Sequence, residues 1–202
     1  MKKNYLLVVV LVLFTLLGVR ETQAVTINFD GLSDSTVLTD QYSGSGVTFS
    51  NATVITAGFT LNEFEFPPHS GSNVVFDDGG LMALTFSTPM ANFGAYFTYS
   101  TDLFLSFFGT ANALVGTVTS AYISNMALSG DPGSSPNELL TFAWASGISS
   151  ILIQGDPAGS SFVMDDMTAN PVSTAVPEPS TLLLLGSGLL GIAGYRIVGR
   201  KV

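Results

Sequence analysis

The residues best suited to chemistry in this 202-residue chain are acidic. Asp30 follows a hydrophobic run near the start, and Asp165 and Asp166 lie together in a similar run near the end. In many jelly rolls the first and last strands are neighbours, which would bring these carboxylates together. Calcium prefers about six to eight oxygen ligands and would relieve their repulsion. We therefore consider a structural calcium ion at Asp30, Asp165 and Asp166; alternatively, Asp30 caps a turn and Asp165 or Asp166 faces solvent.

Other residue patterns argue against catalysis. The only histidine, His69, lies in the turn sequence "EFPPHSGSN", where a histidine usually sits in solvent, and the chain has no GxSxG nucleophile motif. Without cysteine, thiol catalysis and thiolate metal sites are excluded. Glu63 and Glu65 would share one face of a strand, with Phe64 and Phe66 on the other, unlike the two facing carboxylates of a glycosidase. We predict that the protein is not an enzyme.

Aromatic side chains are the residues that could stack on sugar rings. Trp144 is the only tryptophan, and it lies in the apolar run "TFAWASG", which favours packing in the core. Several tyrosines are candidates for a sugar platform, although packing at the edge of the sandwich is the favoured explanation for each of them: Tyr42, Tyr96, Tyr99 and Tyr122.

The elements that position these residues are predicted to be short strands. From Val25 onward, apolar and polar residues alternate in short runs rich in β-branched and aromatic residues. The runs are "VTINFD", "GVTFSN", "NVVFDDGG", "LMALTFS", "FGAYFTYS", "LFLSFFG", "LVGTVTS", "LLTFAWA", "SSILIQG" and "FVMDDMT". Turn residues separate them, and Asp77–Gly80 is typical of a hairpin turn. The pattern predicts an all-β fold, an antiparallel β-sandwich of jelly-roll type spanning residues 25–169.

Charge divides the chain into three parts. All six Lys and Arg residues lie near the ends, and residues 25–175 contain thirteen Asp and Glu but no Lys or Arg. This body therefore has a charge near −13, compared with −9 for the whole chain. Binding to nucleic acid or to anionic lipid headgroups requires cations that the body does not have. We expect no nucleic-acid partner.

The two ends have the composition of targeting segments. Residues 1–24 combine two lysines, an apolar run and small residues at Thr22 and Ala24, which predicts a signal helix cleaved by signal peptidase before Val25. Residues 170–180 are rich in proline and form a predicted linker. Residues 181–202 predict a single short transmembrane helix with a basic tail that stays in the cytoplasm: Arg196, Arg200 and Lys201.

The C-terminal sequence "VPEPST", followed by a short apolar stretch and a basic cluster, resembles the PEP-CTERM sorting signal. Pro177, Glu178 and Pro179 match its recognition motif. The resemblance implies recognition by exosortase, a membrane sorting enzyme of bacteria that make exopolysaccharide. The precursor would be anchored in the inner membrane before the protein reaches the cell surface or the extracellular matrix.

Two functions follow for the body. The first is a structural or adhesive, non-enzymatic sandwich in the cell envelope or the exopolysaccharide matrix. The second is a carbohydrate-binding module, with or without a structural calcium ion. The body also resembles, in its strand and turn patterns, other exported sandwiches that carry this tail.

Overall fold

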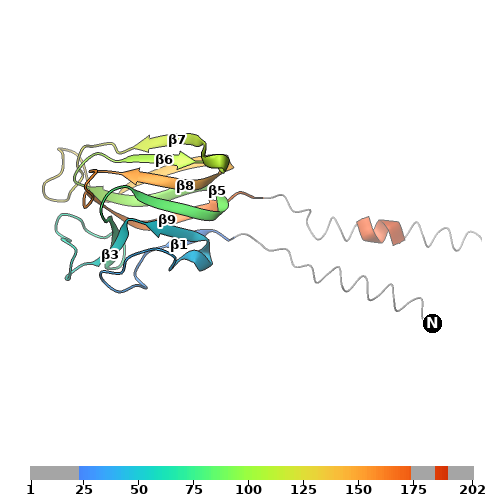
Figure 1. The fold of residues 1–202 in the computed structure, drawn as a ribbon, viewed down its shortest axis with the longest axis horizontal. Coiled ribbons are helices and arrows are strands. Elements are labelled where there is room, and N and C mark those ends of the chain that lie inside the picture. Colours follow the sequence, from blue (N-terminus) through green and yellow to red (C-terminus); the bar gives the residue numbers. More distant parts are fainter. Residues whose placement is uncertain (1–22, 174–184, 191–202) are drawn as a thin grey trace, which may run out of the picture. The chain divides into compact units, whose positions relative to one another are not determined.

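A computed structural model describes residues 23–173 and 185–190 (Figure 1). Residues Thr22–Val172 form a compact unit that holds all nine described strands, and every pairing between them is antiparallel. The strands are β1 (Val25–Ile27), β2 (Val47–Ser50), β3 (Ala52–Thr56), β4 (Asn73–Asp77), β5 (Met82–Tyr99), β6 (Phe104–Phe108), β7 (Leu114–Thr119), β8 (Glu138–Gln154) and β9 (Phe162–Pro171). Two short 3₁₀ turns, η1 (Ser43–Ser45) and η2 (Thr110–Asn112), complete the unit.

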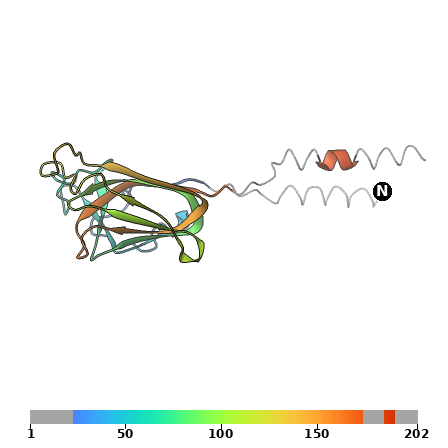
Figure 2. The same ribbon diagram turned by 90° about the horizontal axis from the view of Figure 1, so that it is seen from above.

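The strands follow the order β3-β4-β9-β5-β8-β6-β7, with β1 added beside β9 and β2 beside β5. Strands β5 and β8 are long enough to take part in the sheet twice. The second part of β5, residues 92–97, lies between β9 and the start of β8. Its first part, residues 82–86, lies between β2 and the end of β8, which also pairs with β6. Seen from above, the strands enclose one interior (Figure 2).

The change of direction in the two long strands occurs where their registers shift. The pairing of β5 with β8 is irregular between Thr85 and Asn92, around Pro89. Proline cannot donate a ladder hydrogen bond, so it is tolerated at such an irregularity. Opposite it, Gly147 has φ +100°, and a Cβ there would lie 2.5 Å from Cβ of Pro89. Glycine thus allows the two strands to bend together.

The interior is filled by alternate residues of the strands. The largest side chains of the main cluster that are almost completely buried include Phe29, Phe93, Phe97, Tyr99, Phe107, Leu105 and Phe162. A second, smaller cluster of Leu61, Val74 and Val163 lies under the loop of residues 57–72. This loop covers part of the sheet and also reaches the candidate site described below.

The fold confirms the all-β, antiparallel prediction, with three corrections. The runs "LMALTFS" and "FGAYFTYS" belong to the single strand β5, and "LLTFAWA" and "SSILIQG" belong to β8. Strand β3 was not predicted. Asp77–Gly80 is not a hairpin turn, because β4 pairs with β3 and β9 and not with β5.

Helical structure is scarce in the described residues. Outside the compact unit, residues 185–190 form a helical segment. Among the described residues, none belongs to a helix with the length and apolarity needed to cross a membrane. Most of the predicted signal helix, the sorting motif at Pro177–Pro179 and the basic tail lie outside the described residues.

Candidate functional site

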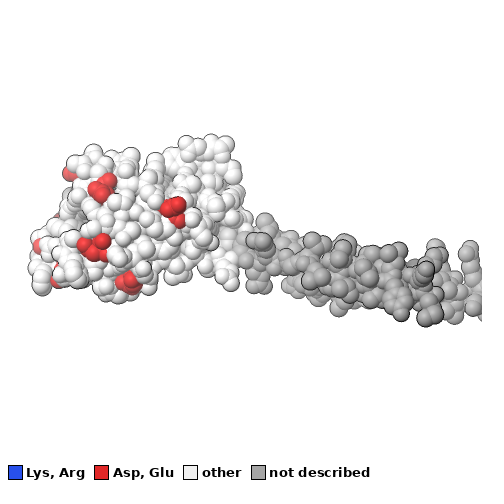
Figure 3. Space-filling view, turned by 60° about the horizontal axis from the view of Figure 1, so that its bottom comes forward, with Lys and Arg blue, Asp and Glu red and all other residues white. Residues whose placement is uncertain are grey.

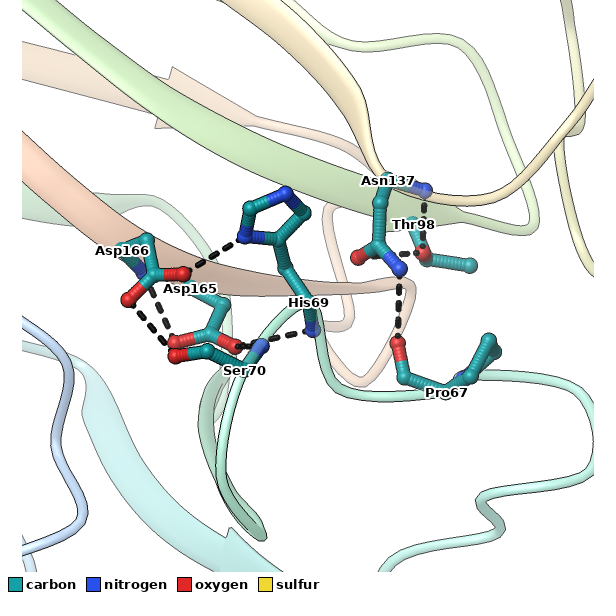
Figure 4. Close-up of polar contacts among 7 residues, drawn as sticks. All are labelled: Pro67, His69, Ser70, Thr98, Asn137, Asp165 and Asp166. Carbon is teal, nitrogen blue, oxygen red and sulfur yellow. Dashed lines mark hydrogen bonds and ion pairs between the residues drawn. The ribbon is translucent and has the colours of Figure 1, made fainter.

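The three acids singled out from the sequence surround one short segment, His69–Asn73. The carboxylate of Asp30 accepts hydrogen bonds from the backbone N–H of Ser72 (2.9 Å) and Asn73 (3.1 Å). The carboxylate of Asp165 accepts from the backbone N–H of His69 and Ser70, each at 2.9 Å (Figure 4). The predicted neighbourhood of the first and last strands is confirmed, since β1 pairs with β9.

Two adjacent carboxylates reach this segment because β9 is irregular. Side chains at successive positions of a strand normally point to opposite faces. Between Gly94 and Tyr96 the pairing of β5 with β9 shifts by one residue, and Asp166 has φ +46°. In this left-handed conformation, its carboxylate contacts Nδ1 of His69 (2.6 Å) and accepts from Oγ of Ser70 (2.8 Å) (Figure 4). A strained backbone at this point therefore gathers polar groups.

Burial makes Asp165 unusual among the acids. Its side chain is almost fully buried, and this burial raises the pKa of its carboxyl group to about 6. Backbone N–H donors from Ser70, Asp166 and His69 act in the opposite direction, while the charge of Asp166 adds to the increase. No Lys or Arg exists between residues 25 and 175 to compensate the charge. Hydrogen-bond donors, rather than a cation, therefore stabilise this carboxylate.

His69 joins this cluster to an aromatic side chain. Its ring stacks on Tyr96, with the ring centroids 3.4 Å apart and the planes 10° apart. The contact between Nδ1 of His69 and the carboxylate of Asp166 is the one contact within salt-bridge distance among the described residues, and it is an ion pair when the imidazole is protonated. His69 is exposed, as expected for this turn, but its ring also has two partners, Tyr96 at one face and Asp166 at Nδ1. The sequence offered no sign of a partner 97 residues away.

A groove opens beside the Tyr96–His69 pair, on the outer face of β9, β5 and β8. Its volume is about 510 Å³. Tyr96 and Leu139 lie on one side and Asn92 and Ala143 on the other, while Gly94 forms the floor. The remaining lining residues are Phe93, Thr141, Phe142, Asp166 and Thr168.

The groove is weakly charged. Among its lining residues within the described part of the chain, Asp166 is the one acidic residue, and none is Lys, Arg or His. Acidic side chains are spread over the face shown in Figure 3 rather than gathered in one patch, and no basic side chain is visible on it. The arrangement offers hydroxyl, amide and carboxylate groups next to apolar surface, which suits an uncharged polar ligand.

The three acids of the predicted calcium site have hydrogen-bond partners within the protein. Among the described residues, no three His, Cys, Asp or Glu side chains are grouped so that they could hold a metal ion. Asp30, Asp165 and Asp166 instead each accept hydrogen bonds from the His69–Asn73 segment. The calcium site remains a prediction.

One aromatic residue, Trp144, does not lie in the core, where the sequence predicts it. Trp144 is 41% exposed and does not belong to the core. Tyr99 is buried, with its hydroxyl 2.5 Å from Glu138, and Tyr42 packs against the core. Tyr122 is partly exposed and donates to the carbonyl of Gly133. Of the four candidate tyrosines, Tyr96 lines the groove.

The glutamate pair also departs from expectation. Residues 63–66 form a turn and a bend rather than a strand, and Phe64 is 72% exposed. The carboxylate of Glu65 accepts from the backbone N–H of Leu128 and Ser129. Glu65 therefore joins two loops, and we assign it a structural role.

Comparison with solved structures finds distant likenesses of the body. The K2 cleaved adhesin domain of Lys-gingipain is 13% identical, with a TM-score of 0.47, over 73% of this chain and 99% of that one. The K1 cleaved adhesin domain of Lys-gingipain from Porphyromonas gingivalis is 6% identical, with a TM-score of 0.46, over 75% and 99%. A family 29 carbohydrate-binding module from Piromyces equi is 14% identical, with a TM-score of 0.37, over 76% and 93%. No functional conclusion rests on likenesses this distant.

Sequence comparison is informative about the tail. No curated protein matches the chain. A family model for the PEP-CTERM protein-sorting motif matches residues 175–201, which include the Pro-Glu-Pro sequence and the basic residues. This match confirms the resemblance noted in the sequence, and the protein is therefore one that carries a PEP-CTERM protein-sorting motif.

Proposed function

We propose that the chain is an exported, non-enzymatic β-sandwich protein of jelly-roll type with a structural or adhesive role in the cell envelope or the exopolysaccharide matrix. The observation that carries this proposal is the sorting motif at residues 175–201. Signal peptidase would remove residues 1–24, the apolar C-terminal segment would hold the precursor in the inner membrane, and exosortase would act on the motif.

The chemistry of the body supports a role without catalysis. The groove contains a single carboxylate, that of Asp166, whereas glycoside hydrolysis uses two. His69 contacts Asp166, but no serine or threonine oxygen is recorded in contact with the His69 ring among the described residues. A nucleophile activated by histidine needs such a contact.

The test is whether a change in the sorting motif alone alters the cell fraction in which the protein is found. Cells of the native host would produce either the natural chain or the variant Pro177→Ala, Glu178→Gln, Pro179→Ala, and the envelope and matrix fractions would be probed with an antibody. We expect the natural chain at the surface or in the matrix and the variant in the inner-membrane fraction. Pro157→Ala, a proline outside the motif, is the matched control and should sort normally. Equal sorting of the motif variant would refute the proposal.

A second candidate function is binding of a polysaccharide by the body. The observation that favours it is the groove over β9, β5 and β8, where hydroxyl groups and apolar surface lie together. Such a site would help to retain the body in a polysaccharide matrix.

A further inference from the structure

A row of small, mostly hydroxyl-bearing residues crosses four adjacent strands of the outer face. Thr26 of β1 is opposite Thr168 of β9, Thr168 is opposite Gly94 of β5, and Gly94 is opposite Thr141 of β8. The three threonines are exposed. Because paired strands lie about 4.8 Å apart, their hydroxyl groups form a line perpendicular to the strands. We call this line the threonine row.

Three members of the threonine row, Gly94, Thr141 and Thr168, line the groove, and they form its floor because Gly94 has no side chain. A Cβ at Gly94 would lie 3.3 Å from Cγ2 of Thr141 and 3.4 Å from Oγ1 of Thr168. The neighbouring positions along the strands carry larger side chains, Asn92 on one side and Tyr96 on the other. On β5, the row therefore forms a depression in the surface between Asn92 and Tyr96.

Both ends of the threonine row reach an edge of the sheet. Within the described strands, β1 pairs with β9 alone, and residues 138–143 of β8 pair with β5 alone. Among residues 23–173, no further strand extends the pairing beyond Thr26 or Thr141. A long molecule lying along the row could continue past both ends, as a polymer requires.

The charge of the site limits the chemistry of this polymer. An anionic sugar would meet Asp166 in the groove and a body charge near −13, with no Lys or Arg to bind its acid groups. A neutral sugar can exchange hydrogen bonds with the threonine hydroxyls and donate to the carboxylate of Asp166. Leu139, which is 51% exposed, offers apolar contact for the carbon face of a sugar ring.

We propose that the threonine row binds a linear, uncharged polysaccharide that lies across the strands. This inference rests on the second candidate function and names its ligand class and its binding residues. The same groove discriminates against polymers that bear carboxylate or sulfate groups.

The test is native gel electrophoresis through gels that contain a dissolved polysaccharide. The full-length protein, kept soluble in a sugar-free zwitterionic detergent, would migrate through hydroxyethylcellulose, dextran, xylan or laminarin, and through the anionic carboxymethylcellulose and dextran sulfate. We expect at least one neutral polymer to retard the protein and neither anionic polymer to do so. Failure of all four neutral polymers, or equal retardation by the anionic forms, would overturn the proposal.

Variants locate the binding surface. Thr141→Val with Thr168→Val removes two hydroxyl groups while keeping β-branched side chains, and we expect at least a tenfold loss of affinity. Gly94→Val should block the row, provided that a thermal melt shows it to be folded. Thr48→Val is the matched control, since Thr48 is exposed on β2, opposite Thr85. Unchanged affinity in the double variant would contradict the proposal.

The outcome is separable from that of the sorting experiment. Correct sorting without retardation would overturn the ligand and leave the proposed localisation intact. Retardation without sorting would overturn the localisation and leave the ligand intact.

Discussion

Asp165 links the chemistry of one side chain to the stability of the body. Its carboxyl group has a pKa of about 6 in the folded protein, above the ordinary value of 3.8, chiefly because it is buried. The folded state therefore holds this proton more tightly than the unfolded state does. The stabilising contribution is fully present below about pH 4 and is lost as the pH rises through 6.

We therefore expect this group to lower the free energy of unfolding by roughly 2–3 kcal/mol between pH 4 and pH 7. Asp77 adds to the trend, since burial also raises its pKa. Urea unfolding at several pH values would measure the slope. Asp165→Asn should reduce the slope, whereas Asp102→Asn, an exposed acid, should not. A body whose stability rises steadily from pH 4 to pH 7 would contradict this account.

At the residue scale, the sequence identified acids that matter but not their partners. Asp30, Asp165 and Asp166 stand out because they adjoin strands in a chain region without cations. Their actual partners are N–H and O–H groups of His69–Asn73, more than 40 residues from Asp30 and about 95 from Asp165. The alternation of apolar and polar residues along a strand does not indicate which loop will contact that strand. The left-handed conformation of Asp166 was equally hidden, since it depends on the shift in strand pairing.

At the scale of elements, the strands themselves were largely predictable, because alternation of apolar and polar residues follows from a sheet with one buried face. The joining of runs into β5 and β8 was not. Proline and glycine are typical of turns, yet Pro89 and Gly147 lie at the bend of two continuous strands. Trp144 was expected in the core, but it lies just before this bend, where burial decreases.

The bend gives a test of how these strands stay continuous. Gly147→Ala places a Cβ against Pro89 and requires a side chain at φ +100°. We expect it to lower the free energy of unfolding by about 1–3 kcal/mol. Chemical denaturation would measure the change, with Gly44→Ala as the control, because a Cβ at Gly44 meets nothing within 4 Å. Equal stability of the two variants would show that the bend does not depend on glycine.

At the scale of the whole molecule, the acidic body achieves its fold without basic residues. The buried carboxylates of Asp77 and Asp165 are satisfied by N–H and O–H donors. We therefore expect the melting temperature to be the same, within about 2 °C, in millimolar calcium and in EDTA at matched ionic strength. Differential scanning calorimetry would measure it. A rise of many degrees in calcium that is lost in Asp30→Asn with Asp166→Asn would contradict this expectation and support the predicted calcium site.

The whole molecule also combines a body and a tail that carry separate information. The motif at residues 175–201 was recognisable from the sequence because its three parts are short and occur in a fixed order. The threonine row was not recognisable, because Thr26, Gly94, Thr141 and Thr168 come from four separate segments of the sequence.

The central claim is that the body reaches the cell surface or matrix through processing of its sorting tail. The most direct measurement is the intact mass of the protein recovered from the matrix, in cells with and without exosortase. We predict a chain that begins at Val25 and has lost the basic residues Arg196, Arg200 and Lys201, and we predict that this form is absent without exosortase. A matrix protein that still carries the complete tail, or that forms equally well without the enzyme, would contradict the account.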